Sequence, residues 1–143
     1  MSRKLNLYLA ERDPIGAAEL LADKQAVAMV MVESQAGAAR ARFITVAPGK
    51  SMVYDRKVKE AEAFAEIADP KSEDYPLLAA EAEARKIPLS DMAELVVSKQ
   101  TEWAEVAGLI EALTVTAKAA IDAAGNEAQI RAAVAGIAWP KPV

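Results

Sequence analysis

The residues best suited to chemistry in this sequence are glutamates that occur in close pairs. There are three such pairs: Glu60/Glu62, Glu81/Glu83 and Glu102/Glu105. Residues two positions apart lie on different faces of a helix, whereas residues three apart share a face. Only Glu102 and Glu105 therefore have the spacing to hold a divalent cation together. A solvated helix surface produces the same pattern more often, so we predict no metal site.

A second candidate is the turn Ala47–Ser51, because its Gly-Lys-Ser ending is similar to the end of a phosphate-binding loop. Such a loop needs a further glycine near its start, so that backbone amides can surround the phosphates. Neither Ile44 nor Thr45, which lie five and four residues before Gly49, is a glycine. We therefore interpret the segment as a turn before a helix and predict no cofactor.

Cysteine and histidine are both absent from the sequence. This excludes disulfides, thiol nucleophiles and thiolate zinc sites. It also excludes a catalytic histidine and a histidine pH switch. Together with the weak glutamate and turn signals, this predicts a protein that is not an enzyme and has no catalytic residues.

The composition predicts an all-α, alanine-rich helical bundle. The chain has 143 residues, of which 33 are alanine and only 7 aromatic. Alanine has the highest helix propensity, but its methyl group buries little apolar surface. We expect an N-terminal arm at residues 1–12 and a single helical domain at 13–143. Because its core is thin, partner chains are expected to add stability.

Charge and hydropathy limit the partners. The net charge is −4 and the isoelectric point about 5.0, whereas nucleic-acid binders usually present a basic face. The longest apolar run, Ala26–Val32, is far shorter than the about 20 residues that cross a bilayer. We predict a soluble protein that binds neither nucleic acid nor membrane.

Breakers and capping residues predict where the helices begin and end. Helices are expected at 15–44, 51–68, 74–85, 91–124 and 126–138, with the first two forming an antiparallel pair around the turn at 46–51. Asp74 and Ser90 are the expected N-caps. Gly125 is expected directly after the last residue of the helix at 91–124, where it would end that helix. Asn126 and Gln129 fit a capping box. Residues 3–9 alternate like a strand, which pairs with another chain's sheet edge or stays unordered.

The long helix at 91–124 carries a sustained heptad pattern. Its apolar seam is spaced four and three residues apart at Met92, Val96, Trp103, Val106, Ile110, Leu113, Ala117, Ala120 and Ala124, interrupted only by Lys99. Such a seam fits either the core of an intramolecular bundle or an intermolecular coiled coil. Both interpretations stay open, so the first six of these residues are interface candidates.

Two further features concern packing. In the first helix, one expected core stripe contains Leu20, Val27, Met31, Ala38 and Ala41. Ala26–Val32 is apolar all round, which predicts that this helix is covered on several faces. Trp139, after the last helix, either fixes the C-terminus to the bundle or anchors a partner, and is the seventh interface candidate.

A spaced set of residues surrounds the first turn: Arg40, Phe43, Ile44, Thr45, Gly49, Tyr54, Lys57, Glu60 and Ala61. This pattern resembles small helical proteins encoded with the tail genes of tailed bacteriophages and prophages. The segments Tyr75–Glu81 and Lys118–Ala124, together with Trp103, continue the likeness, which covers roughly residues 25–138. Lys50 departs from the glutamine usual after the turn glycine.

The resemblance implies a non-enzymatic structural protein of the phage tail or tail fibre, present in the virion. It would act by contacts with tail or fibre proteins, and a homo-oligomer is compatible with this role. The alternative is a tail-fibre assembly chaperone that works in the host cytoplasm and is not retained in the virion. The residues by themselves agree only in indicating helical association without catalysis.

Overall fold

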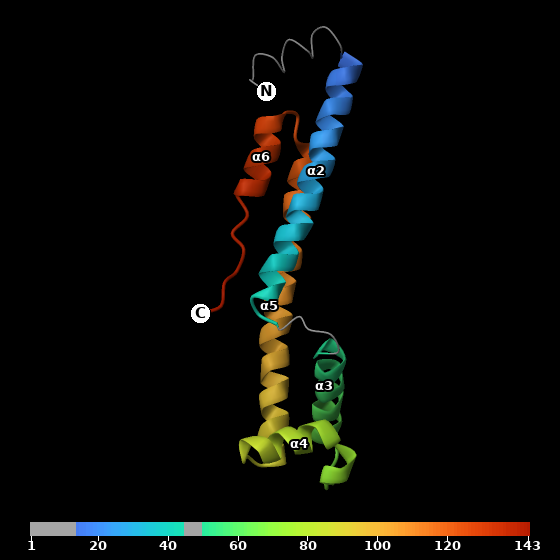
Figure 1. The fold of residues 1–143 in the computed structure, drawn as a ribbon, viewed down its shortest axis with the longest axis vertical. Helices are drawn as coiled ribbons and strands as arrows, with labels where there is room; N and C mark the ends of the chain where they lie inside the picture. Colours follow the sequence, from blue (N-terminus) through green and yellow to red (C-terminus); the bar gives the residue numbers. More distant parts are fainter. Residues whose placement is uncertain (1–13, 45–49) are drawn as a thin grey trace. The chain divides into compact units, whose positions relative to one another are not determined.

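The computed structural model describes residues 14–44 and 50–143, and this part of the chain is all α, as predicted (Figure 1). The elements are α2 (Pro14–Ala41), α3 (Lys50–Glu66), the 3₁₀ helix η1 (Ser72–Asp74), α4 (Pro76–Arg85), α5 (Leu89–Ala123) and α6 (Glu127–Ala135). The predicted long helix is confirmed as α5, with 35 residues. The expected N-terminal arm lies outside the described residues.

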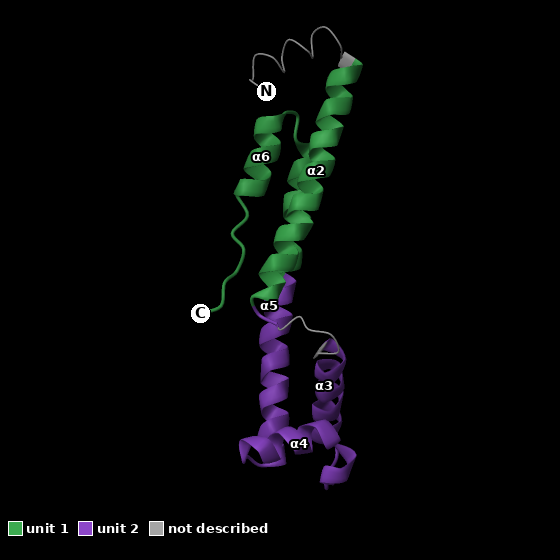
Figure 2. Cartoon of the chain, viewed as in Figure 1, with its two compact units in different colours: residues 1–42, 109–143 green, residues 43–108 purple. Residues whose placement is uncertain are grey.

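The chain forms two compact units, which Figure 2 colours separately. Unit 1 comprises residues 1–42 and 109–143, and unit 2 comprises residues 43–108. Helix α5 contributes its second half to unit 1 and its first half to unit 2. Helices α2 and α3 fall in different units, so the expected antiparallel pair is not a feature of either one.

Unit 2 has a core of large apolar side chains. Its buried cluster consists of Ala61, Tyr75, Leu78, Ala82, Met92, Ala93 and Val96. Phe64 packs edge-on against Tyr75 with ring centroids 5.4 Å apart, a favourable aromatic geometry. Helices α3, α4 and the first half of α5 each contribute to this cluster, which holds the unit together.

The start of α4 is capped from another helix. Asp74 was expected to cap it, but the N-cap residue is Tyr75, which makes no side-chain cap bond. The Glu60 carboxylate of α3 instead accepts hydrogen bonds from the amides of Leu77 (3.1 Å) and Leu78 (3.0 Å). A carboxylate is stabilised there by the free amides and the helix dipole. This role buries Glu60, whereas a glutamate of a close pair was expected more often on a solvated helix surface.

The end of α4 contains the only non-glycine residue with positive φ in the described part of the chain, Lys86 (φ 58°). The Lys86 amide donates to the Glu83 carbonyl, and the Ile87 amide to the Ala82 carbonyl. This pair of bonds ends a helix in a Schellman motif. Helix α5 begins soon after, at Leu89, so Ser90 lies inside the helix rather than at its predicted N-cap.

Unit 1 packs α2, the second half of α5, and α6 around smaller side chains. Its buried cluster consists of Ala28, Val32, Ala117, Ile121, Ala124 and Ile130. Alanines at the contacts allow the helix backbones to approach closely, at the expense of buried apolar area. The cluster therefore contains no buried side chain larger than isoleucine.

The junction between α5 and α6 is held by side-chain amides. One half of the predicted capping box is present, since Asn126 accepts from the Gln129 amide (2.9 Å). The Gln129 side chain accepts in turn from the Gly125 amide (2.6 Å), and Gly125 does not adopt positive φ. From α2, Gln25 donates to the Ile121 carbonyl (2.9 Å), which satisfies an acceptor at the end of α5.

Candidate interaction surface

One apolar face of α2 is exposed on unit 1. Val27 is 61% exposed, Val30 70% and Met31 47%, although the sequence predicted Val27 and Met31 for the core stripe. Ala38 and Ala41 of that stripe are also exposed. That prediction was wrong by about one residue of helix rotation, because Ala28, Val32, Ala36 and Ala39 form the buried face instead.

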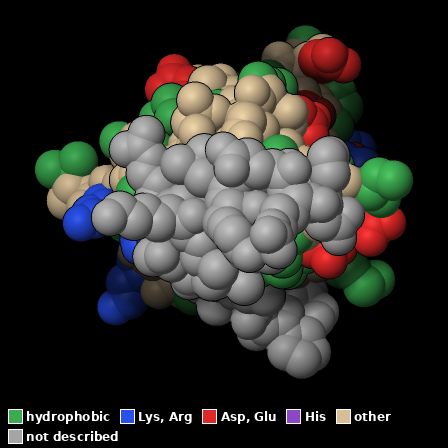
Figure 3. Space-filling view, turned by 90° about the horizontal axis from the view of Figure 1, so that it is seen from above, with side chains coloured by type: hydrophobic (Ala, Val, Ile, Leu, Met, Phe, Trp, Pro, Cys, Tyr) green, Lys and Arg blue, Asp and Glu red, His purple; other side chains and the backbone are tan. Residues whose placement is uncertain are grey.

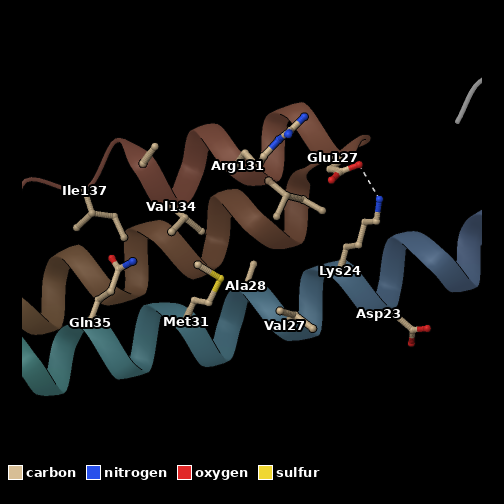
Figure 4. A pocket seen from close by; sticks show the side chains of 12 residues that line it. Asp23, Lys24, Val27, Ala28, Met31, Gln35, Glu127, Arg131, Val134 and Ile137 are labelled. Atoms are coloured by element: carbon tan, nitrogen blue, oxygen red, sulfur yellow. Dashed lines mark hydrogen bonds and ion pairs between the residues drawn. The ribbon is translucent and has the colours of Figure 1, made fainter. Parts of the chain in front are cut away.

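Two of these exposed side chains, Val27 and Met31, line a groove of about 680 Å³ between α2 and the C-terminal segment of the chain (Figure 4). Its apolar walls are Val27, Ala28, Met31, Ile130, Val134, Ala135 and Ile137. In Figure 4, Met31 points from α2 toward α6, and Val134 points from α6 toward α2. The groove is therefore an apolar surface left open between two helices.

Two polar contacts span this groove. Lys24 of α2 forms an ion pair with Glu127 of α6 (N–O 2.6 Å), drawn as the dashed line in Figure 4. Further along α2, the Gln35 side chain accepts from the indole N–H of Trp139 (2.9 Å). Because these contacts lie at separate points along α2, they fix α6 and the following tail at the distance that keeps the groove open.

Two charges on the groove's lining have no partner. Neither Asp23 on α2 nor Arg131 on α6 makes a hydrogen bond or an ion pair within residues 14–44 and 50–143. Figure 4 shows Asp23 pointing away from α6, and Arg131 pointing away from α2. Among the described residues, the groove thus has one unpaired anion along one edge and one unpaired cation along the other.

On another side of α2, surface ion pairs connect it to α5. Glu33 pairs with Lys118, and Arg40 with Glu111 at 3.7 Å. The hydrogen bond from Lys118 and its positive charge lower the pKa of the Glu33 carboxyl. These pairs therefore lie on the side of α2 that is already occupied within the unit.

Of the predicted interface residues in unit 2, some lie in the core. Met92 and Val96 are buried in the cluster described above, so they serve intramolecular packing. Trp103 and Val106 are only half-buried. Lys99, which interrupts the predicted seam, is exposed, as expected for a long charged side chain.

The remaining seam residues show that the heptad pattern changes in unit 1. Ile110 is fully buried, but Leu113 is half-buried and Ala120 is exposed. Thr114 and Ile121 are buried in their place, and the Thr114 hydroxyl donates to the Ile110 carbonyl (2.8 Å). After Ile110 the buried face thus follows spacings of four, three, four and three: Ala117 and Ala124 are buried as predicted, whereas Thr114 and Ile121 each lie one residue later than the predicted Leu113 and Ala120.

Trp139 is half-buried against the unit 1 cluster. Its N–H is bonded to Gln35, and the neighbouring Pro140 carbonyl accepts from Arg42 at 3.5 Å. Of the two predicted roles, the structure therefore shows Trp139 fixing the C-terminal segment to α2.

The glutamate pair and the turn that the sequence offered for chemistry lie at the surface or largely outside the described residues. Glu102 and Glu105 are both exposed, and most of the turn Ala47–Ser51 lies outside the described residues. The described residues contain no cluster of three or more carboxylates arranged to hold a metal ion. None of the described helices is long and apolar enough to cross a membrane. In the space-filling view, hydrophobic side chains reach the surface among acidic and basic ones (Figure 3).

The residues that the sequence did not identify are Val30, Asp23 and Arg131. The all-apolar run Ala26–Val32 was a signal that α2 has more than one contact face. It could not show which face the unit itself uses, because both faces are apolar at helical spacing. The two charges became notable only when the structure placed them beside the groove without partners.

Comparison with protein-family models, with curated proteins and with solved structures finds no match to this chain.

Proposed function

We propose that this chain is a non-enzymatic structural protein of a bacteriophage tail or tail fibre, which acts through protein–protein contacts in the virion. The observation that carries the contact role is the exposed apolar face of α2, where Val27 and Met31 line an apolar groove and Val30 is exposed beside them. Contiguous exposed apolar surface is typical of protein interaction sites. The assignment to a phage tail rests on the sequence resemblance.

The alternative within the same proposal is a tail-fibre assembly chaperone that acts in the host cytoplasm. An open groove between two helices is a shape that holds an amphipathic helix of another protein. A chaperone would release that helix when the fibre matures, whereas a structural protein would retain it. The two roles therefore differ in when the contact exists rather than in its chemistry.

The test is to follow an epitope-tagged chain in the cell that encodes it, during particle production. Particles are purified on a density gradient, and the chain and the fibre protein are quantified across the fractions by mass spectrometry. A structural role predicts a constant ratio of chain to fibre protein through the particle peak. A chaperone role predicts that the chain co-purifies with unassembled fibre only.

A pair of matched variants tests whether the exposed face of α2 makes the contact with particles or fibre. Val30→Glu places a charge on the exposed face of α2, while Val115→Glu makes the same change at a valine of α5 that is 57% exposed. We expect Val30→Glu to lower the amount of chain bound to particles or fibre, and Val115→Glu to have little effect. A chain found with neither particles nor fibre overturns the proposed function.

A further inference from the structure

We propose that the groove between α2 and α6 is a self-association site, in which the occupant is α2 of a second copy of this chain. This inference goes beyond the proposed function and does not rest on it. It concerns only contacts of the chain with itself, which are measured with the purified protein.

The first support is the double apolar face of α2. One face, containing Ala28 and Val32, is buried inside unit 1, while the other, containing Val27 and Val30, is exposed. The eight residues from Gln25 to Val32 carry no charge. A helix that lies on this face therefore buries no unpaired charge in that stretch, which would otherwise be costly.

The second support is that the groove has the length of a short helix contact. Its two spanning contacts begin at Lys24 and Gln35, eleven positions apart on α2. This separation is roughly 16 Å, or about three helical turns, at 1.5 Å per residue. The apolar walls lie between these points, so the groove matches the central part of a helix such as α2.

The third support is a ridge on α2 that fits such a groove. Ala22, Ala26 and Val30 are spaced four residues apart, and all three are exposed. Side chains at this spacing form the ridges by which one helix packs against another, and small ones allow close approach. A single copy thus carries both the ridge and the groove, as a contact between identical chains requires.

The fourth support selects a second copy over a different partner. In a two-fold contact, a residue at one edge meets its counterpart from the other edge, and the reverse contact is made simultaneously. A groove with charges of one sign would repel its own copy. Here the unpaired charges are Asp23 on α2 and Arg131 on α6, so Asp23 of each chain can pair with Arg131 of the other.

The test begins with solution mass, measured by light scattering and sedimentation velocity over a wide concentration range. We expect a concentration-dependent rise from one chain, 15.2 kDa, to twice that mass. Val30→Glu should shift the midpoint to at least about tenfold higher concentration, because it places a charge in an apolar contact. Val115→Glu should leave the midpoint unchanged.

A charge exchange tests the pairing itself. Asp23→Arg alone, and Arg131→Asp alone, should each weaken association by placing like charges opposite one another. The double variant should restore it, because both pairs are rebuilt with reversed polarity. All four proteins should have the same melting temperature at low concentration, since both side chains are exposed.

Three outcomes overturn the proposal. The first is a monomer at every concentration, and the second is association that Val30→Glu does not weaken more than Val115→Glu. The third is a double charge variant that stays as weak as the single ones. Since none of these readouts involves particles or fibre protein, failure here and failure of the proposed function are distinguishable.

Discussion

The two units differ in how they use their apolar side chains. Unit 2 buries Tyr75, Leu78 and Met92 in one cluster, whereas unit 1 packs alanines with valine and isoleucine. Unit 1 in turn leaves Val27 and Val30 of α2 exposed. The two units therefore differ in the size of the side chains that they bury, and the exposed valines of unit 1 include Val27, which lines the groove.

The largest expected effect is the loss of core volume in unit 2. Leu78 is fully buried, so Leu78→Ala should lower the free energy of unfolding by about 2–5 kcal/mol, measured by urea denaturation. Met52→Ala removes a side chain that is 76% exposed and should change it by less than about 0.5 kcal/mol. Equal losses from the two variants would contradict the assignment of this core.

A second prediction concerns the Glu60 cap. Glu60→Ala leaves the amides of Leu77 and Leu78 without their acceptor, which should cost about 1–3 kcal/mol. Amide hydrogen exchange at these two residues should accelerate. The control Glu62→Ala alters an exposed carboxylate and should change stability by less than about 0.5 kcal/mol. Unchanged exchange would show that Glu60 is not the cap.

The corresponding cap in unit 1 should be weaker. Gln25 is a neutral donor to carbonyls at the end of α5, so Gln25→Ala should cost about 0.5–1.5 kcal/mol. Gln25→Glu should cost more, because a carboxylate facing the Ile121 carbonyl is repelled by it and by the helix dipole. The stabilities of the two Gln25 variants are compared by their denaturation midpoints, with Glu19→Ala on the exposed face of α2 as the control. A Gln25→Glu variant as stable as the original chain would disprove the contact.

One substitution should stabilise unit 2. Lys86 has φ 58° and ψ 44°, a conformation that costs a non-glycine residue about 1–2 kcal/mol. Glycine removes this strain but adds chain entropy, so Lys86→Gly should raise stability by about 0.5–1 kcal/mol. At Lys99, in the interior of α5, the same change should lower stability by about 1 kcal/mol. If calorimetry shows that both glycine substitutions change stability in the same direction, the expected strain at Lys86 is refuted.

The smallest effect is a pH dependence in unit 2. Lys57, which hydrogen-bonds Glu81 at 2.8 Å, lowers the pKa of that carboxyl below its ordinary value of 4.5, and Arg85 at 2.9 Å adds to this shift. As the pH falls, the unfolded chain binds the proton first. The stabilisation is therefore present above pH 4.5 and is lost as the pH falls through the folded-state pKa.

Glu81→Gln should consequently lower stability at neutral pH by less than about 1 kcal/mol, because the pair is partly solvated. The difference from the original chain should disappear in acid. Urea titrations from neutral to acidic pH measure it, with the exposed Glu83→Gln as the reference. If the stability difference between Glu81→Gln and the original chain grows in acid, the direction assigned to the pKa shift of Glu81 is wrong. The Glu33–Lys118 pair of unit 1 is more exposed, so its effect should be smaller still.

The helices themselves were largely predictable from the sequence. The long helix was expected at 91–124 and lies at Leu89–Ala123, because alanine-rich sequence, Pro88 before it and Gly125 after it determine helix limits locally. The Asn126 cap was predicted for the same reason, since Asn126 and Gln129 act within one turn, although the Gln129 side chain bonds Gly125 rather than Asn126. Neither inference required knowledge of distant neighbours.

Contacts between helices were decided only by the tertiary structure. The cap from Glu60 joins residues 17 and 18 positions apart, and the Gln25 contact joins residues 96 apart. No local pattern marks such partners. The same limit explains why the predicted stripe with Val27 and Met31 proved to be surface: both faces of α2 are apolar, and only packing in unit 1 selects between them. The sequence by itself thus determined where helices form, because propensity and capping are local. Which faces they bury depended on neighbours that the fold alone brings together.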